Sequence, residues 1–306
     1  VHDSVNLYSK YVPTKAAVVF GGVKINPQMM KLRKGLDVLV ATPGRLMDLY
    51  QQNAVRFNEV EILVLDEADR MLDMGFIGDI NKIIERLPEQ RQNLLFSATI
   101  SNEVRSLAKR SIYRPVEISI KQDKTSSPKI EQWLVTVDKG NKSALLSHLI
   151  KEQEWDQALI FIETKQGAAK LVSQLEKRGI PVESIHGDRT QAVRERILSE
   201  FKSGQIKFLV ATGVAARGLD IQNLSRVVNY DVPDQVEDYI HRIGRTGRAG
   251  ATGEAISFVA KDNFRNLCAI ESRLGHVITR RAFEGFDVKK TVPESILNYV
   301  TKNKQK

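Results

Sequence analysis

Short apolar segments alternate with helical patterns along most of the chain, and this alternation restricts the fold more than any other feature. In the first part of the chain, strand-like segments lie at residues 16–20, 37–41, 61–65, 93–96 and 116–120. They lack the every-second-residue polarity of half-exposed strands, which is typical of a parallel sheet covered on both faces. We therefore predict an α/β fold in which helices, such as the one expected at 77–87, cover parallel sheets.

The alternation is interrupted once and then restarts. Residues 121–129 are polar and contain Pro128 and two serines, a composition typical of a linker. Five further strand-like segments follow, at residues 157–162, 182–186, 207–211, 226–230 and 254–259. Strands that alternate with helices imply right-handed βαβ units. We therefore expect one domain over residues 1–120, a linker over 121–129 and a second domain over 130–275.

The charge of the chain indicates the class of partner. The sequence has 46 Lys and Arg residues against 37 Asp and Glu residues, a formal net charge of +9. This excess favours nucleic acid first and an anionic membrane surface second. Residues 276–306 form a basic extension, for which a solvated tail and an RNA-gripping segment are both open. No apolar run reaches the roughly 18 residues of a membrane span, so we expect no spanning helix.

The cysteine content limits the chemistry. Cys268 is the one cysteine in the sequence, so neither an intrachain disulfide nor a cysteine-based metal site is expected. This favours a reducing compartment.

The polar motifs follow the strand-like segments directly. In an open parallel sheet, ligands bind beyond the carboxyl ends of the strands. In the first half the motifs are Thr42-Pro43-Gly44-Arg45, Asp66-Glu67-Ala68-Asp69 and Ser97-Ala98-Thr99. In the second half they are His186-Gly187-Asp188, the segment ATGVAARGLD (211–220) and the segment HRIGRTGRAG (241–250). Both halves therefore place their candidate functional residues where a ligand of a parallel sheet would lie.

The acidic motif raises a physical question, because three carboxylates within four residues repel one another. One reading is that acidic residues favour the first turn of the helix that follows. The other is that a divalent cation and positively charged partners offset the repulsion. Residues 66–69 taken alone do not separate these readings.

The ordered set of six motifs resembles that of the DEAD-box RNA helicases of superfamily 2, over residues 18–260 and closest to the bacterial RhlE-type subgroup. The resemblance implies two RecA-like domains, with ATP and Mg²⁺ as cofactors and RNA as the partner. The implied activity is ATP-dependent unwinding of short RNA duplexes, or remodelling of RNA–protein complexes. We expect a cytoplasmic monomer, and the resemblance leaves open whether it joins ribosomal or RNA-degradation assemblies.

The resemblance also assigns roles in nucleotide chemistry. Asp66 would hold Mg²⁺ through water, and Glu67 would orient and deprotonate the attacking water. Arg245 and Arg248 would act as arginine fingers that contact the γ-phosphate. Gly218 and Asp220 would bind the nucleotide, with Asp220 at the ribose. Residues assigned to coupling between the domains are Asp69, Ser97, Thr99 and His241.

RNA is expected to be bound through its backbone, without reading of its sequence. The positions that match this role are Gly22, Pro43, Gly44, Arg45, Thr164, Lys165, Gln191, Arg194, Thr212 and Gly213. Each also has a plain structural reading, because glycine pairs form turns and Thr-Pro-Gly can simply connect a strand to a helix.

The sequence contains no G-x-x-x-x-G-K-[ST] phosphate-binding loop. We therefore expect the first domain to be incomplete at its N-terminus, with an unpaired sheet edge, and the chain alone to hydrolyse ATP poorly. Three alternatives stay open: an RNA-binding or adaptor fragment without turnover, a related DNA helicase, and an ATPase that moves something other than nucleic acid.

Overall fold

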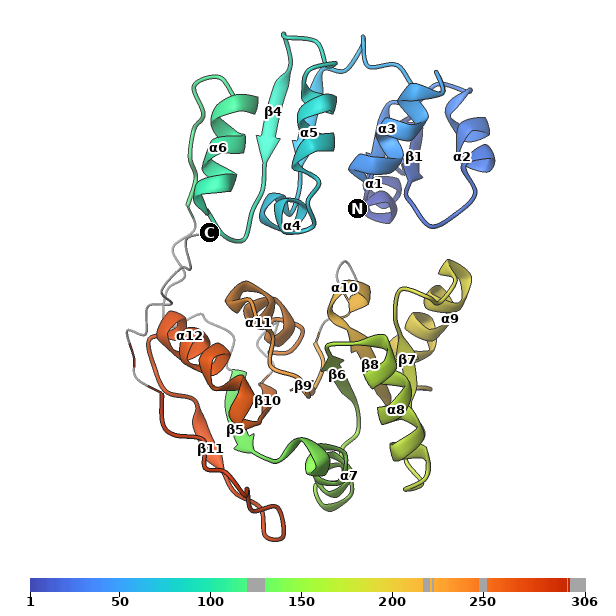
Figure 1. The fold of residues 1–306 in the computed structure, drawn as a ribbon. Helices are drawn as coiled ribbons and strands as arrows, with labels where there is room; N and C mark the ends of the chain where they lie inside the picture. The colour runs from blue at the N-terminus through green and yellow to red at the C-terminus, as the bar shows by residue number, and fades with distance from the viewer. Residues whose placement is uncertain (120–129, 217–220, 222, 248–251, 296, 298–306) are drawn as a thin grey trace. The chain divides into compact units, whose positions relative to one another are not determined.

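The computed structural model describes residues 1–119, 130–216, 221, 223–247, 252–295 and 297 (Figure 1). The chain divides into two compact units, residues 1–121 and 122–306. This division falls at the predicted linker, residues 121–129, all of which lie outside the described residues. Each unit contains parallel strands that alternate with helices, as the sequence predicts.

The first unit contains four short strands and six helices in its described part. The strands are β1 (Ala16–Val19), β2 (Val38–Ala41), β3 (Ile62–Leu65) and β4 (Gln92–Leu95). The helices are α1 (His2–Tyr8), α2 (Ile25–Leu32), α3 (Pro43–Gln51), α4 (Ala68–Asp73), α5 (Ile77–Ile84) and α6 (Asn102–Ser111). Strand β1 pairs in parallel with β2, and β3 pairs in parallel with β4, so the four strands form two separate sheets.

The β3–β4 sheet is packed on one face only. Leu63, Leu65 and Leu95 pack against the small apolar clusters beneath α3, α4 and α5. On the opposite face, Ile62 is 55% exposed and Phe96, just after β4, is 54% exposed. The described helices of this unit therefore cover one face of the β3–β4 sheet.

The strand predicted at 116–120 is wrong for residues 116–119, and residue 120 lies outside the described part. Residues 116–119 form no ladder, and Val116 and Ile118 are 86% and 85% exposed. A β-strand needs a neighbouring strand to accept and donate its backbone hydrogen bonds. None of the four described strands of this unit pairs with the segment, so its apolar composition alone does not make it a strand.

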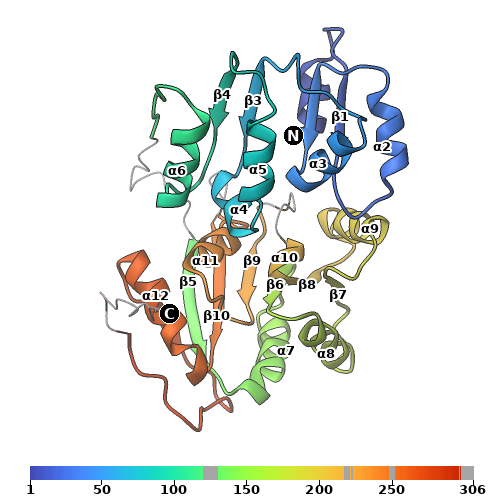
Figure 2. The same cartoon turned by 45° about the horizontal axis from the view of Figure 1, so that its top comes forward.

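The second unit contains one seven-stranded parallel sheet in the order β11-β5-β10-β9-β6-β8-β7 (Figures 1 and 2). The strands are β5 (Ile130–Thr136), β6 (Ala158–Ile162), β7 (Glu183–Ile185), β8 (Phe208–Thr212), β9 (Arg226–Asn229), β10 (Gly253–Val259) and β11 (Thr279–Arg281). The helices are α7 (Lys142–Glu152), α8 (Lys165–Glu176), α9 (Gln191–Lys202), α10 (Gly213–Ala216), α11 (Val236–Ile243) and α12 (Phe264–Leu274), with short 3₁₀ turns at Lys139–Asn141 and Lys261–Asn263.

Helices cover both faces of this sheet. Helices α7 and α8 pack on the face that presents Ile160 and Ile162 of β6. Helices α9, α11 and α12 pack on the other face, which presents residues such as Leu159 and Phe161. Every residue of β6 and β8 is buried. The near-continuous apolar runs of these strands follow from this two-sided burial.

Part of the basic extension joins the second unit. Strand β11 pairs in parallel with β5 at one edge of the sheet, and Val292 and Ser295 are buried. The carboxylate of Glu271, fully buried on α12, accepts the Ile278 amide at 2.8 Å and the Ser295 hydroxyl. The described part of the extension therefore packs against α12 and β5. The second unit continues past the boundary expected at residue 275.

Candidate functional site

The acidic motif forms a tight turn at the carboxyl end of β3. Glu67 has a φ of 50°, in the left-handed region, where a residue other than glycine costs about 1–3 kcal/mol. Its amide donates to Asp66 Oδ1 at 2.9 Å, and its carboxylate pairs with Arg70 Nη1 at 2.9 Å. Asp66 and Glu67 are exposed, whereas Arg70 is buried. The turn thus directs two neighbouring carboxylates outward from the end of a strand.

The third acid of the motif, Asp69, faces inward and is 7% exposed. Its Oδ2 accepts both the amide and the hydroxyl of Thr99 at 2.8 Å. The amide of Asp69 donates to Ser97 Oγ at 3.2 Å, and Ser97 Oγ donates to the Thr99 carbonyl at 2.7 Å. The segments after β3 and β4 are therefore joined through Asp69, whose carboxylate binds Thr99 and whose amide binds Ser97; the role of these residues in coupling the domains stays a prediction.

The residues around Asp66 suit a cation that keeps bound water better than a cation whose ligands all come from the protein. Among the described residues, no group of three or more His, Cys, Asp or Glu side chains is arranged to hold a metal. The Asp66 carboxylate accepts only the Glu67 amide within the same part of the chain. Mg²⁺ commonly keeps several waters and takes one or two carboxylates together with substrate phosphates.

The predicted RNA contacts of the first unit lie together. Gly22 has a φ of 79°, and Pro43 is the first residue of α3. Arg45 Nη2 donates to the Val23 carbonyl at 2.8 Å, which joins the loop after β1 to α3. The remaining Arg45 donors, Nε and Nη1, are buried and have no hydrogen-bond partner within the described residues; Nε lies 3.8 Å from Asp48. A guanidinium held in this way can still bind an oxygen acceptor such as phosphate.

In the second unit, two of the predicted RNA contacts lie at the start of α8. Thr164 caps the helix by accepting the Gly167 amide at 3.0 Å. Lys165 Nζ pairs with Asp188 Oδ2 at 2.8 Å. This ion pair lowers the pKa of the Asp188 carboxyl. Lys165 therefore already has an anionic partner, and an RNA phosphate would compete with Asp188 for its ammonium group.

The other predicted RNA contacts of this unit lie at α9 and at the end of β8. Arg194 Nη1 donates to Gln191 Oε1 at 3.3 Å, and Nη2 donates to the Ala215 carbonyl at 3.3 Å. Thr212 ends β8 and Gly213 begins α10. A side chain at Gly213 would bring its Cβ within 3.5 Å of Arg242 Nη2. These contacts link the beginning of α9 to the segment that follows β8.

Helix α11 carries the coupling candidate His241, and the arginine-finger candidate Arg245 follows the helix. His241 is half-buried near the end of the helix. The Arg245 carbonyl accepts the Leu224 amide at 3.2 Å. Gly218, Asp220 and Arg248 lie outside the described residues, so their assigned roles stay predictions.

One cluster was missed by the sequence reasoning. Lys142, 4% exposed at the start of α7, donates to Asp231 Oδ1 at 3.0 Å and to the Tyr230 carbonyl at 2.6 Å. Burial lowers the pKa of Lys142, and the Asp231 carboxylate opposes this. Asp231 directly follows a predicted strand, 226–230, so the strand-end rule could have identified it. The strand β5 was also missed, although its residues WLVT are apolar or β-branched.

No helix in the described part of the chain is both long and apolar enough to cross a membrane. This agrees with the sequence, in which no apolar run approaches that length.

Two family models match the chain. The model described as DEAD/DEAH box helicase matches residues 1–107, and the model described as helicase conserved C-terminal domain matches residues 141–250. The two matches fall in the first and second unit, respectively.

Curated relatives match most of the chain. The ATP-dependent RNA helicase RhlB of Vibrio vulnificus strain YJ016 is 41% identical over 95% of this chain and 68% of its own length. RhlB of Vibrio cholerae strain M66-2 is 44% identical over 86% of this chain and 61% of its own length. The chain thus spans about two thirds of these relatives. Because they carry the RhlB name, the RhlE-type subgroup expected from the sequence is not supported.

Solved structures are also similar to most of this chain. Dbp5 of S. cerevisiae bound to RNA and ADP BeF3 is 32% identical, with a TM-score of 0.81 over 92% of this chain and 73% of that chain. A DEAD box protein from Methanococcus jannaschii is 36% identical, with a TM-score of 0.52 over 92% of this chain and 76% of that chain.

Proposed function

Because the chain belongs to the DEAD-box family of ATP-dependent RNA helicases, we propose that its protein couples ATP hydrolysis to the local opening of short RNA duplexes. The observation that carries the proposal is the outward turn of Asp66 and Glu67, joined through Asp69 to Ser97 and Thr99. The relative Dbp5 bound to RNA and ADP BeF3 supports both the nucleotide and the RNA as ligands.

Each described side chain has a task in this proposal. Asp66 would hold Mg²⁺ through water, and the cation would neutralise charge on the phosphates. Glu67, held by Arg70, would orient the attacking water and accept its proton. Arg245 would stabilise the charge that develops on the transferred phosphoryl group.

RNA would be bound by its backbone in both units. Arg45 keeps two guanidinium donors without a hydrogen-bond partner among the described residues, and a local rearrangement would bring them to a phosphate. Thr164 and Lys165 place a hydroxyl and an ammonium group at the start of α8. Contacts of this kind position a strand without reading its bases. A cytoplasmic, monomeric protein is part of the same proposal, and the single cysteine supports the location.

The test is RNA-stimulated ATP hydrolysis by the full-length protein, compared between wild type and Glu67→Gln. The variant should lose turnover because it lacks the base, yet it should still retain RNA in the presence of ATP. Glu61→Gln, an exposed acid just before β3, is the matched control and should keep wild-type turnover.

The alternatives predict different results. Unchanged turnover in Glu67→Gln would refute the assigned base. RNA binding by the wild type without any stimulated hydrolysis would select the adaptor fragment. Preference for DNA over RNA duplexes in competition would select a DNA helicase.

A further inference from the structure

The carboxyl ends of β6 and β9 are joined by one residue that the proposed function does not use. Asp231 lies two residues beyond the end of β9. Its amide donates to the Phe161 carbonyl of β6 at 3.2 Å. Its Oδ2 accepts the amide of Glu163 at 3.1 Å. Asp231 therefore holds the backbone immediately before Thr164 and Lys165, the proposed RNA contacts at the start of α8.

The same residue is held by a buried cation. Lys142 donates to Asp231 Oδ1, its ammonium lies 5.3 Å from the centre of the Tyr230 ring, and its side chain is 4% exposed. Because the Lys142 ammonium is buried, loss of its partner Asp231, whose side chain is 28% exposed, would leave that charge uncompensated. The geometry of Asp231 is thus defined by two fixed donors, the Lys142 ammonium and the Glu163 amide.

Asp231 also contacts helix α11, which the arginine-finger candidate Arg245 follows. Arg242 Nη1 donates to the Asp231 carbonyl at 2.8 Å and to Asn229 Oδ1 at 3.4 Å. The Arg242 guanidinium lies 5.1 Å from the centre of the Phe161 ring, and Arg242 is 8% exposed. Arg242 belongs to α11, next to His241 and three residues before Arg245. A displacement of the segment after β6 would therefore be transmitted to α11 through two contacts, that of Glu163 with Asp231 and that of Asp231 with Arg242.

We propose that Asp231, held by Lys142, is a positioning residue that couples RNA binding at Thr164 and Lys165 to the placement of α11 and of Arg245, which follows the helix. This inference rests on the proposed function and adds a route within the second unit by which RNA stimulates hydrolysis. Asp231 itself would touch neither the RNA nor the nucleotide.

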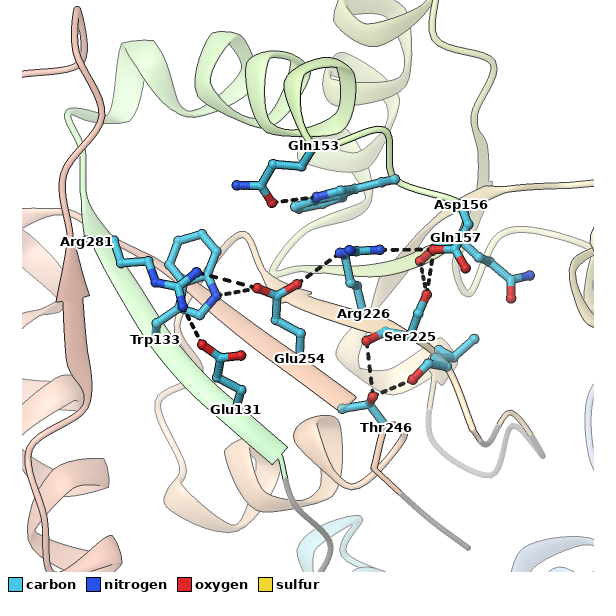
Figure 3. Close-up of polar contacts among 12 residues, drawn as sticks. Glu131, Trp133, Gln153, Asp156, Gln157, Ser225, Arg226, Thr246, Glu254 and Arg281 are labelled. Carbon is cyan, nitrogen blue, oxygen red and sulfur yellow. Dashed lines mark hydrogen bonds and ion pairs between the residues drawn. The ribbon is translucent and has the colours of Figure 1, made fainter. Parts of the chain in front are cut away.

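A second charge cluster in the same unit provides a matched comparison (Figure 3). At the beginning of β9, Arg226 pairs with Glu254 at 2.9 Å and with Asp156 at 3.0 Å. Glu254 also accepts the Trp133 indole at 2.7 Å. Arg281 on β11 also pairs with Glu254 at 3.7 Å, at the sheet edge that β11 and β5 form. The beginning of β9 adjoins Arg245, because the Leu224 amide donates to the Arg245 carbonyl, so Arg281 serves as the control. Its loss should affect stability without affecting coupling.

The experiment compares Asp231→Asn, Lys142→Met and the control Arg281→Met in the full-length protein, below the melting temperature of each. The readout is the ratio of RNA-stimulated to RNA-free ATP turnover. We expect this ratio to fall about tenfold in Asp231→Asn and Lys142→Met, within the range by which residues between two sites alter coupling. Arg281→Met should keep the wild-type ratio even where its melting temperature falls.

The outcomes separate the two proposals. A purely structural role would lower the stimulated and RNA-free rates in parallel, and an unchanged ratio would overturn the inference. An equal fall of the ratio in Arg281→Met would also overturn it. If Asp231→Asn does not fold, Lys142→Met, which preserves side-chain volume, decides the matter. If the wild type shows no RNA stimulation at all, the proposed function itself fails.

Discussion

The two units follow the same α/β rules but differ in how completely their sheets are built. In the second unit, seven parallel strands form one sheet, and every residue of β6 and β8 is buried beneath helices on both faces. In the described part of the first unit, four strands form two separate pairs, and β3 exposes Ile62 and Val64. The sequence patterns of these strands are alike, so the difference lies in the number of neighbours each strand has.

This comparison shows which features need a complete sheet. The Asp66-Glu67 turn and the Asp69–Thr99 contact are formed in the smaller sheet, because they depend on only two adjacent strands and the loops after them. Burial of the apolar face does need more neighbours. A local functional motif can therefore be present on a sheet that is packed on one face only.

The largest effect should come from loss of the Arg245 guanidinium of the second unit. Arg245→Ala should lower RNA-stimulated ATP turnover about 10³-fold, because arginine fingers stabilise transition-state charge by this much or more. Steady-state turnover at saturating RNA measures it. The control is Arg273→Ala, an exposed arginine at the end of α12, which should remain close to wild type. A loss below about tenfold in Arg245→Ala would show that the second unit does not supply the finger.

A core substitution should distinguish the two sheets by stability. Phe201 is fully buried on α9, and Phe201→Ala should destabilise the second unit by about 3–5 kcal/mol because it leaves a cavity. Val64 is 51% exposed, so Val64→Ala should change stability by no more than about 0.5 kcal/mol. Urea unfolding followed by tryptophan fluorescence reports the second unit, because both tryptophans, Trp133 and Trp155, belong to it, and unfolding followed by far-UV circular dichroism reports both units. Similar costs for the two variants would contradict the difference in packing.

The attachment of the extension should depend on pH. Burial raises the pKa of Glu271 above its ordinary 4.5, although the Ile278 amide and Arg280 oppose the rise. The folded protein therefore binds this proton more tightly than the unfolded chain does. The stability contributed by protonation is fully present below pH 4.5 and is lost as the pH rises through the higher folded-state pKa.

Glu271→Gln removes this titration and keeps an acceptor for the Ile278 amide. Wild-type stability, measured by urea unfolding relative to the variant, should therefore decline as the pH rises from 4.5 towards neutrality. A difference that stays constant with pH would show that Glu271 does not titrate in this way.

The smallest effect should come from loss of the single exposed contact that Lys165 is proposed to make with RNA. Lys165→Ala should weaken RNA binding similarly for all sequences and reduce the slope of log affinity against log salt by about 1. Fluorescence anisotropy with single-stranded RNA at several salt concentrations measures this slope. Lys170→Ala, an exposed lysine on the same helix, is the control. Asp188→Asn should strengthen binding, because it removes the carboxylate that competes for Lys165; weaker binding would contradict that competition.

Much of the fold could be predicted because apolar periodicity follows local chain geometry. The segments expected at 61–65, 157–162 and 207–211 correspond closely to β3, β6 and β8. The segment at 116–120 has the same apolar character, yet residues 116–119 form no strand. Strand β5, which the periodicity did not identify, forms because β10 and β11 flank it on both sides.

The candidate site likewise has features that the sequence predicted and features that it did not. The sequence by itself determined which polar residues follow which strands, because motif order and strand ends are properties of consecutive residues. Only the tertiary structure decided that Asp69 faces inward to Thr99, that Lys142 is buried against Asp231, and that Glu271 holds the extension. Such contacts join residues up to 89 positions apart. They depend on how separate elements pack and exclude water, which no local pattern encodes.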